Sequence, residues 1–318
     1  MPVLPAYVNT NFDDDELLRA AIALVHGDLV PARDVLAATR DQPHRRELAA
    51  DVLGAAGTVV LPALVKAVRE RPDDVDLVLL LGVAQAAEGW KSRGAAWAQD
   101  TTAEQFRGLE AFSRLARETL HRAAELAPDD AVPWSALMSV AVGAPRHRNE
   151  AAEVYDEVVR RVPDMVNATL RRLQSTAEKW QGSRGEMSAF ARGGVVNLPD
   201  GHPLLCLIPI AHIEVQLLKE WTGNGMLQRW HELSAVYLRR QRAEVDAASD
   251  RLLAGPDGHP HSLWAHQIFS VYYYEIRAKG RLAKHLVRGG ERVMRWPWEY
   301  FGNPNDRFRK ARALASLG

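Results

Sequence analysis

The fold of this chain is decided by the stretch LHRAAELAPDDAVPWSAL, residues 120–137. Its apolar residues return every three or four positions, which is the spacing of an α-helix, until Pro128 and Asp129 interrupt the pattern. Proline cannot continue a helix because it has no backbone N–H, whereas aspartate can accept a hydrogen bond from the first turn of a new helix. The stretch therefore predicts the end of one helix and the beginning of the next.

The same Pro-Asp pair follows a helical pattern five times, at Pro72-Asp73, Pro128-Asp129, Pro163-Asp164, Pro199-Asp200 and Pro256-Asp257. The prolines lie 56, 35, 36 and 57 residues apart. The two inner intervals match one helix-turn-helix unit of about 34 residues, the period of tetratricopeptide-type repeats. No segment alternates apolar and polar residues between hairpin turns. The sequence thus predicts an all-α protein, a right-handed α-solenoid of antiparallel, tetratricopeptide-like helix hairpins without significant β-sheet.

A solenoid grows by stacking units on their neighbours, so we expect residues 1–318 to form one helical body. Its subregions are N-terminal helices over 1–58, repeat-like units over 59–198 and irregular helical units over 199–318. The last subregion contains a literal duplication: the sequence PDGHP occurs at 199–203 and again at 256–260. Each copy precedes an apolar helix that contains Ala-His, at Ala211-His212 and Ala265-His266. The role of the duplicate is open at this point.

Charge and cysteine content limit the classes of partner. Forty Lys and Arg balance forty Asp and Glu, so no net field gathers nucleic acid or an anionic membrane. The single cysteine, Cys206, excludes a disulfide within the chain and a cysteine-based zinc site. The N-terminus has no basic leader, and no uninterrupted apolar run reaches the roughly 18 residues of a membrane span. We expect a cytoplasmic protein without a cofactor.

The most unusual central string is KWQGSRGEMSAFAR, residues 179–192. In a structural interpretation, Ser183 caps a helix that begins near Glu186, with Glu186 completing a capping box. In a functional interpretation, turn amides together with Lys179, Arg184 and Arg192 receive an anionic group, and Trp180 forms an apolar wall. Both interpretations remain open.

This string resembles a family of uncharacterised actinobacterial tetratricopeptide-like proteins, related to a domain of unknown function. The family pattern is Lys-Trp-x-Gly-Ser, then Met and Phe-Ala-Arg; it corresponds here to Lys179-Trp180, Gly182-Ser183, Met187 and Phe190-Ala191-Arg192. Further similar segments are His26-Gly27-Asp28, Arg71-Pro72-Asp73, Ala123 to Pro128, Ala211-His212-Ile213-Glu214 and Trp296-Pro297-Trp298. The resemblance implies a helical-repeat fold and no particular reaction.

Histidines and tryptophans supply further candidates. His212, His231 and His266 lie in apolar helices, but no His-Glu-x-x-His pair puts two ligands on one helical face, so no metal site is predicted. Nine tryptophans fall mostly at helix ends, where they either fill joints between hairpins or line a groove. Trp90 and Trp134 are the candidates for such a groove.

Three functions remain. The first is a noncatalytic scaffold that binds a peptide or protein segment in a concave groove; its ligand-binding candidates are Trp90, Trp134, Lys179, Trp180, Ser183, Arg184, Arg192 and His212. The second is an enzyme of specialised metabolism acting on a small molecule, with His212 or Glu214 as the acid-base group and Lys179 or Arg184 holding an anion. The third is a structural homodimer. A scaffold needs an open groove, whereas a catalyst needs a closed pocket of about 300 to 1,000 Å³ with a buried ionisable pair, such as His212 with an acidic residue in hydrogen-bond reach.

Overall fold

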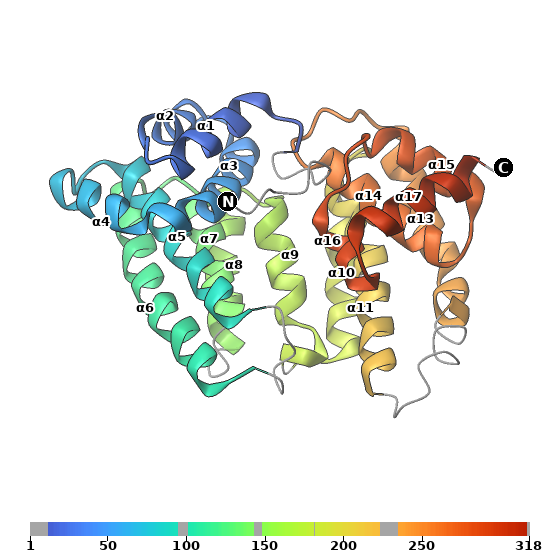
Figure 1. Cartoon of the computed structure of the whole chain (residues 1–318). Coiled ribbons are helices and arrows are strands. Elements are labelled where there is room, and N and C mark those ends of the chain that lie inside the picture. Colours follow the sequence, from blue (N-terminus) through green and yellow to red (C-terminus); the bar gives the residue numbers. More distant parts are fainter. Residues whose placement is uncertain (1–11, 95–100, 143–147, 181, 223–234, 317–318) are drawn as a thin grey trace. The chain divides into compact units, whose positions relative to one another are not determined.

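The computed structural model describes residues 12–94, 101–142, 148–180, 182–222 and 235–316, and every regular element in these ranges is a helix (Figure 1). The predicted all-α class is confirmed. The chain divides into two compact units. We call Asp14–Ser175 the N-terminal unit, and Thr176–Gly318 with Met1–Asp13 the C-terminal unit.

The expectation of a single body over 1–318 with subregion boundaries after 58 and 198 stays a prediction from the sequence. The boundary falls directly after Ser175, inside the subregion expected to hold the regular repeats. The reason is local: the backbone N–H groups of Gly182 and Ser183 donate to the carbonyls of Ala177 and Thr176. These hydrogen bonds tie Thr176 and Ala177, the first residues after the boundary, to Gly182 and Ser183 of the same unit.

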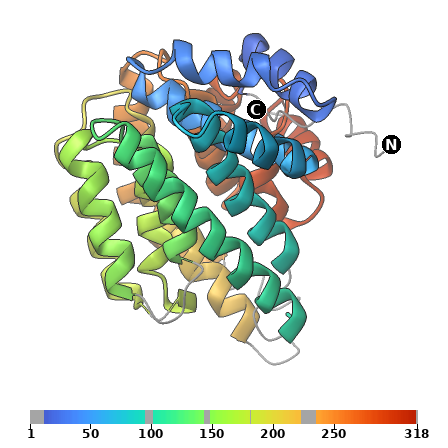
Figure 2. The same cartoon turned by 90° about the vertical axis from the view of Figure 1, so that its left-hand side faces the viewer.

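The N-terminal unit consists of helices joined by short turns. They are α1 (Asp15–Val25), α2 (Val30–Ala38), α3 (Pro43–Gly57), η1 (Thr58–Val60), α4 (Leu61–Glu70), α5 (Val75–Arg93), α6 (Ala103–Leu126), α7 (Val132–Val142), α8 (Arg148–Arg161) and α9 (Val166–Ser175). Helices α5 and α6 run side by side in opposite directions (Figure 2). Helix α5 forms the core of this unit because its residues from Asp76 to Ala86 are buried all round.

One stretch, Pro43–Glu70, is long and apolar enough to cross a membrane by length and composition alone. In the structure it comprises three elements, α3, η1 and α4, and α3 packs against α1 and α5. Its first turn carries two buried charged side chains, those of Arg46 and Glu47. Burial of part of this stretch against other helices accounts for its apolar character.

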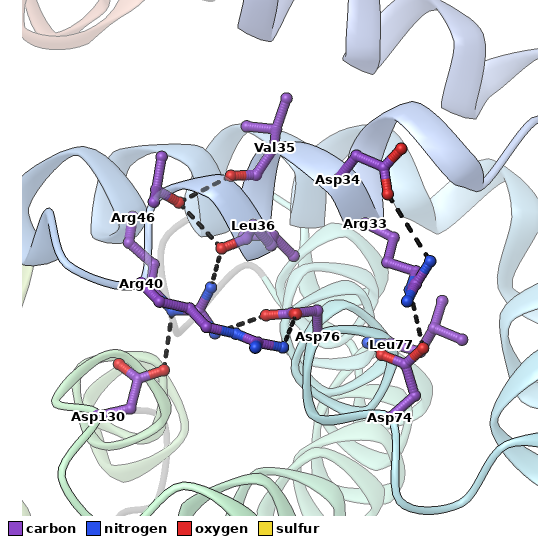
Figure 3. A network of polar contacts seen from close by, with 11 residues as sticks. Arg33, Asp34, Val35, Leu36, Arg40, Arg46, Asp74, Asp76, Leu77 and Asp130 are labelled. Atoms are coloured by element: carbon purple, nitrogen blue, oxygen red, sulfur yellow. Dashed lines mark hydrogen bonds and ion pairs between the residues drawn. The ribbon is translucent and has the colours of Figure 1, made fainter.

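Arg46 is the centre of an ionic network in the N-terminal unit (Figure 3). Its side chain is 1% exposed, and its guanidinium donates to Asp76 and to Asp130, each at 2.8 Å. Arg46 also donates to the carbonyl of Leu36, and Arg40 pairs with Asp76 from the solvent side. Because a buried charge is costly unless it is paired, this network fixes α2 and α3 against α5 and the turn before α7.

The neighbouring Glu47 caps a helix far away in sequence. Its carboxylate is fully buried and accepts hydrogen bonds from the backbone N–H groups of Asn167 and Ala168, each at 3.0 Å. The hydroxyl of Ser135 donates to the same carboxylate at 2.5 Å. These N–H groups belong to the first turn of α9, so a side chain from α3 satisfies the N-terminus of α9.

The C-terminal unit has shorter and less regular elements. They are η3 (Glu178–Trp180), α10 (Arg184–Val195), η4 (Pro203–Cys206), α11 (Leu207–Thr222), a helical stretch over 235–240, α13 (Arg242–Ala254), α14 (Ser262–Glu275), α15 (Lys279–Arg288), α16 (Arg295–Trp298), η5 (Glu299–Phe301) and α17 (Pro304–Ser316). The pattern predicts one long helix from Met226 to about Leu253. Residues 223–234 lie outside the described ranges, and the rest is interrupted by a turn at Gln241.

The duplicated PDGHP segments pack against each other. The N–H of Gly201 donates to the carbonyl of Arg251 at 3.0 Å, and a Cβ added at Gly255 would lie 2.2 Å from the carbonyl oxygen of Asp200. The rings of His202 and His259 meet edge to face, with centroids 5.4 Å apart. The backbones therefore approach closely at Gly201 in the first copy and at Gly255 directly before the second copy, where a side chain has no room.

A chain of buried polar groups crosses the core of the same unit. The Nδ1 atoms of His266 and His285 lie 2.9 Å apart. His266 Nε2 contacts Asp257 at 2.9 Å, and His285 Nε2 contacts the hydroxyl of Ser249 at 2.8 Å. Burial lowers the pKa of both imidazoles, most strongly that of His285. Both rings are thus neutral core residues at neutral pH.

Candidate functional site

A cavity of about 380 Å³ lies beside α10 in the C-terminal unit. It is lined by Arg184, Gly185, Ser188, Ala189, Arg192, His212, Tyr237 and Gln241. These residues come from three places in the sequence: α10, α11 and the region around the turn at Gln241. Its volume falls within the range of about 300 to 1,000 Å³ that is typical of small-molecule sites.

Helix α10 supplies the cationic wall. Arg184, Ser188 and Arg192 follow one another at intervals of four, so they share one face of the helix. Ser183 caps this helix, because its hydroxyl accepts from the N–H of Glu186 at 3.2 Å. Met187 and Ala191 are buried on an adjacent face and hold α10 in place. The cap and the buried side together fix where the two guanidiniums enter the cavity.

His212 on α11 supplies the buried end of the cavity. Its side chain is 6% exposed, and both ring nitrogens have partners. Nδ1 lies 3.1 Å from the hydroxyl of Tyr237, and Nε2 lies 3.1 Å from Oε2 of Glu244. The imidazole is therefore held between a phenol and a carboxylate.

The protonation states of this triad follow from its surroundings. A hydrogen bond from Arg192 holds the pKa of Glu244 below its usual value, so the carboxylate is ionised and only accepts. Burial lowers the pKa of His212, which leaves one N–H on the neutral ring. That N–H is on Nε2 and donates to Glu244, and Nδ1 accepts the hydroxyl proton of Tyr237.

Two arginines complete the electrostatics. Arg192 Nε donates to Glu244 Oε1 at 2.7 Å, and its Nη2 donates to Oε2 at 3.1 Å. The guanidinium carbon of Arg184 lies 5.1 Å from the centre of the Tyr237 ring, which is a cation-π contact. Burial raises the pKa of Tyr237 while Arg184 opposes this effect. The phenol therefore keeps its proton at neutral pH, next to a positive charge.

The structure brings Arg184, Arg192 and His212 together, three of the residues proposed from the sequence. Ser183 lies beside them but acts as the helix cap. In the predicted capping box, the side chain of Glu186 would accept from the backbone N–H of Ser183. That N–H donates instead to the backbone carbonyl of Thr176.

Lys179 and Glu214 form a second cluster. Lys179 Nζ donates to Glu214 Oε2 at 2.7 Å, and the hydroxyl of Tyr300 donates to Glu214 Oε1 at 3.1 Å. Glu214 follows His212 by two positions on α11, which places the two side chains on opposite sides of that helix. Glu214 therefore ties the C-terminal aromatic segment to α11 and η3, and Glu244 occupies the place beside His212. Trp180 is half-buried in η3.

Trp90 and Trp134 belong to the N-terminal unit. The indole N–H of Trp90 donates to the carbonyl of Ser139 at 3.0 Å. Trp134 meets His121 edge to face and carries the guanidinium of Arg161 over its ring, 5.1 Å from the centre. Both indoles fill spaces between neighbouring helices, as in the alternative that the sequence left open.

Tyr237 and Glu244 are site residues that the sequence interpretation missed. They lie seven positions apart in a segment expected to be one helix, where that spacing corresponds to one face. That spacing was the available signal, but many charged pairs in the chain share it. The turn at Gln241 and the packing against α11 bring Tyr237 and Glu244 to opposite sides of the His212 ring.

Within the described ranges, no group of three or more His, Cys, Asp or Glu side chains is arranged to hold a metal ion. His231, one of the histidines considered from the sequence, lies outside those ranges. Cys206 is buried in η4, and burial raises the pKa of its thiol, so this residue packs as a small apolar group.

Comparison of the chain with family models and with curated proteins found no match. The resemblance to actinobacterial tetratricopeptide-like proteins stays an expectation from the sequence. The cavity beside α10 is therefore the feature from which a function can be inferred.

Proposed function

We propose that the C-terminal unit binds a small anionic molecule in the cavity beside α10 and transfers a proton to or from it through Tyr237. The observation that carries this proposal is the placement of His212, with Tyr237 and Glu244 each 3.1 Å from one of its ring nitrogens. A histidine and an acidic group in hydrogen-bond reach beside an open pocket support acid-base chemistry at this site.

The proton path supports this function. The neutral ring of His212 can take the phenolic proton at Nδ1, and the imidazolium can return a proton to the Tyr237 oxygen after Tyr237 has given its own to the substrate. Glu244 stabilises the imidazolium through Nε2, as a carboxylate does in a nucleophile-histidine-acid triad. The adjacent guanidinium of Arg184 stabilises the negative charge that develops on the Tyr237 oxygen. Tyr237 is the group that touches the substrate, and His212 and Glu244 act through it.

The two arginines support an anionic ligand. Arg184 and Arg192 lie on one face of α10, and both are exposed at the cavity. Guanidinium groups bind carboxylates and phosphates through paired N–H donors. Because Arg192 is already paired with Glu244, Arg184 offers the first contact to an incoming anion.

The test compares the wild-type chain with Tyr237→Phe, which keeps the ring and removes the hydroxyl. Each protein is incubated with a fractionated pool of anionic metabolites, and compound masses are followed over time. We expect at least one compound to be consumed by the wild type and by the exposed-surface control Arg309→Ala, but not by Tyr237→Phe. Equal consumption by wild type and Tyr237→Phe, or none by either, would contradict the proposal.

A second candidate function is the noncatalytic scaffold. We infer that the N-terminal unit is a stack of tetratricopeptide-like hairpins, supported by the neighbouring pairs α5-α6 and α7-α8 and by the Pro-Asp turns between them. The exposure of Arg184 and Ala189 favours access to the cavity by the carboxylate end of a peptide. In a pull-down from native cytoplasm, this function predicts a protein partner that Arg184→Ala loses and Arg309→Ala retains.

A further inference from the structure

We propose that Arg192 couples anion binding to protonation of His212, so that an oxyanion ligand enters the cavity together with one proton. This inference rests on the proposed anion-binding function of the same cavity. It identifies the ligand class as a carboxylate, sulfate or phosphate group, and it makes Arg192 a positioning residue that acts through Glu244.

The coupling begins with an oxygen atom that two donors share. Arg192 Nη2 and His212 Nε2 both lie 3.1 Å from Oε2 of Glu244. The side chain of Arg192 is 58% exposed and lines the cavity, whereas that of His212 is 6% exposed. Arg192 can therefore turn toward a ligand while His212 stays in place. An oxyanion in the cavity competes with Glu244 for the guanidinium of Arg192. When Arg192 turns from Glu244 to the oxyanion, the negative charge of Glu244 is no longer neutralised by Arg192 and interacts more strongly with His212.

The charges around His212 give the sign of the effect. Helix α10 presents Arg184 and Arg192, the stretch 235–240 presents Tyr237, and α13 presents Glu244. Burial is the largest effect and lowers the pKa of His212. The hydrogen bond and the negative charge of Glu244 raise this pKa, whereas the positive charges of Arg192 and Arg184 lower it. An anion that neutralises the arginines removes two of the lowering effects and adds a negative charge near the ring. Ligand binding consequently favours the imidazolium.

Among the described side chains, four more titratable groups on the packed elements contact partners other than His212. From α14, which packs on α11, the hydroxyl of Tyr272 donates to the carbonyl of Leu238, and that of Tyr273 donates to Asp246. His266 contacts Asp257 and His285, as described above. On α11 itself, Glu214 is neutralised by Lys179.

Protonation also changes the direction of one hydrogen bond. In the neutral ring, Nδ1 accepts the Tyr237 proton; in the imidazolium, Nδ1 carries a proton and donates to the Tyr237 oxygen. The phenolic O–H is then released from His212 and can donate to the bound oxyanion. The anion thus converts Tyr237 from a donor to histidine into a donor to the ligand, and one proton is taken up from solvent with each anion bound.

The experiment is a pH titration by NMR of the full chain labelled with ¹³C-histidine and ¹³C-tyrosine. The His212 resonance is assigned by its loss in His212→Gln. Sodium sulfate is the probe anion, and sodium chloride at equal ionic strength is the control. We expect saturating sulfate to raise the apparent pKa of His212 by on the order of one unit, which corresponds to roughly tenfold tighter sulfate binding in the fully protonated form.

Arg192→Gln is the decisive variant, and Arg309→Ala is the matched surface control. Without sulfate, the pKa of His212 in Arg192→Gln should lie above that of the wild type, because a nearby cation is gone and Glu244 faces the ring alone. Sulfate should then raise it by much less than in the wild type. Arg309→Ala should titrate as the wild type does in both conditions.

The outcomes separate this inference from the proposed function. If sulfate shifts the ring resonances of Tyr237 but leaves the pKa of His212 unchanged, the anion site stands and the coupling is overturned. If sulfate raises the pKa equally in wild type and Arg192→Gln, Arg192 is not the coupling residue and the inference is also overturned. If sulfate changes no resonance of the cavity residues, the anion-binding function fails, and the coupling fails with it.

Discussion

At the scale of single residues, the aspartates of the Pro-Asp turns have different functions. Asp74 and Asp130, each one position after the pair, accept from the N–H groups of Leu77 and Val132 in the first turns of α5 and α7. Asp73 itself pairs with Arg122 on the surface. The sequence pattern thus places the helix ends correctly but assigns the cap to the neighbouring residue, because the turn after proline needs one more residue before the new helix begins.

The buried network around Arg46 gives the first prediction. Asp76→Ala removes a 1% exposed carboxylate and leaves Arg46 with a partly unpaired buried charge, so we expect the free energy of unfolding to fall by about 3 kcal/mol. Asp73→Ala, which removes the 79% exposed partner of Arg122, should cost less than about 1 kcal/mol. Urea denaturation of both variants measures the difference. Equal costs would show that the network does not stabilise the fold.

The buried histidines give a prediction on pH. Since burial lowers the pKa of His266 and His285, the unfolded chain binds protons before the folded chain does as the pH falls below about 6.5. The free energy of unfolding should therefore decrease between pH 7.5 and 5.5, by up to about 1.4 kcal/mol per pH unit for each proton. His285→Gln should show a smaller decrease over the same range. An identical pH dependence in wild type and His285→Gln would contradict the assignment.

At the scale of elements, the duplicated segments form a tight backbone joint. A Cβ at Gly255 would lie 2.2 Å from the carbonyl oxygen of Asp200 and cannot be accommodated without moving the backbone. We expect Gly255→Ala to destabilise the protein by about 1 to 3 kcal/mol. Gly258→Ala is the matched control from the same turn, because nothing lies within 4 Å of its added Cβ. The midpoints of thermal unfolding of the two variants test this prediction. Similar midpoints would show that the backbone around Gly255 moves aside at little cost.

Helix α10 allows the two interpretations of Ser183 to be separated. As an N-cap, Ser183 contributes to the stability of α10, and Ser183→Ala should lower the free energy of unfolding by about 1 kcal/mol. Because its hydroxyl is occupied by the N–H of Glu186, the affinity for sulfate should stay within about twofold of the wild type. A loss of sulfate affinity with unchanged stability would instead make Ser183 part of the anion site.

At the scale of the whole molecule, the division into two units predicts that damage stays local. Each unit has its own buried core, with α5 at the centre of one and α14 at the centre of the other. In hydrogen exchange followed by mass spectrometry, Asp76→Ala should speed exchange in peptides of 14–175 and leave those of 176–316 near wild-type rates. Gly255→Ala should do the opposite. Faster exchange across the whole chain in either variant would indicate one cooperative body.

The sequence alone determined the helical class and most helix ends, because apolar periodicity, prolines and caps act over a few residues. It also identified Arg184, Arg192 and His212 as candidates, since their residue types and helical context are visible locally. The tertiary structure decided the rest. Glu47 caps a helix about 120 positions away, Gly255 meets the backbone of Asp200, and the acidic residue that contacts His212 is Glu244 from another helix. These contacts join residues that no local sequence pattern connects. They form because helix packing brings distant side chains together, and because a buried polar group is costly unless it is hydrogen-bonded.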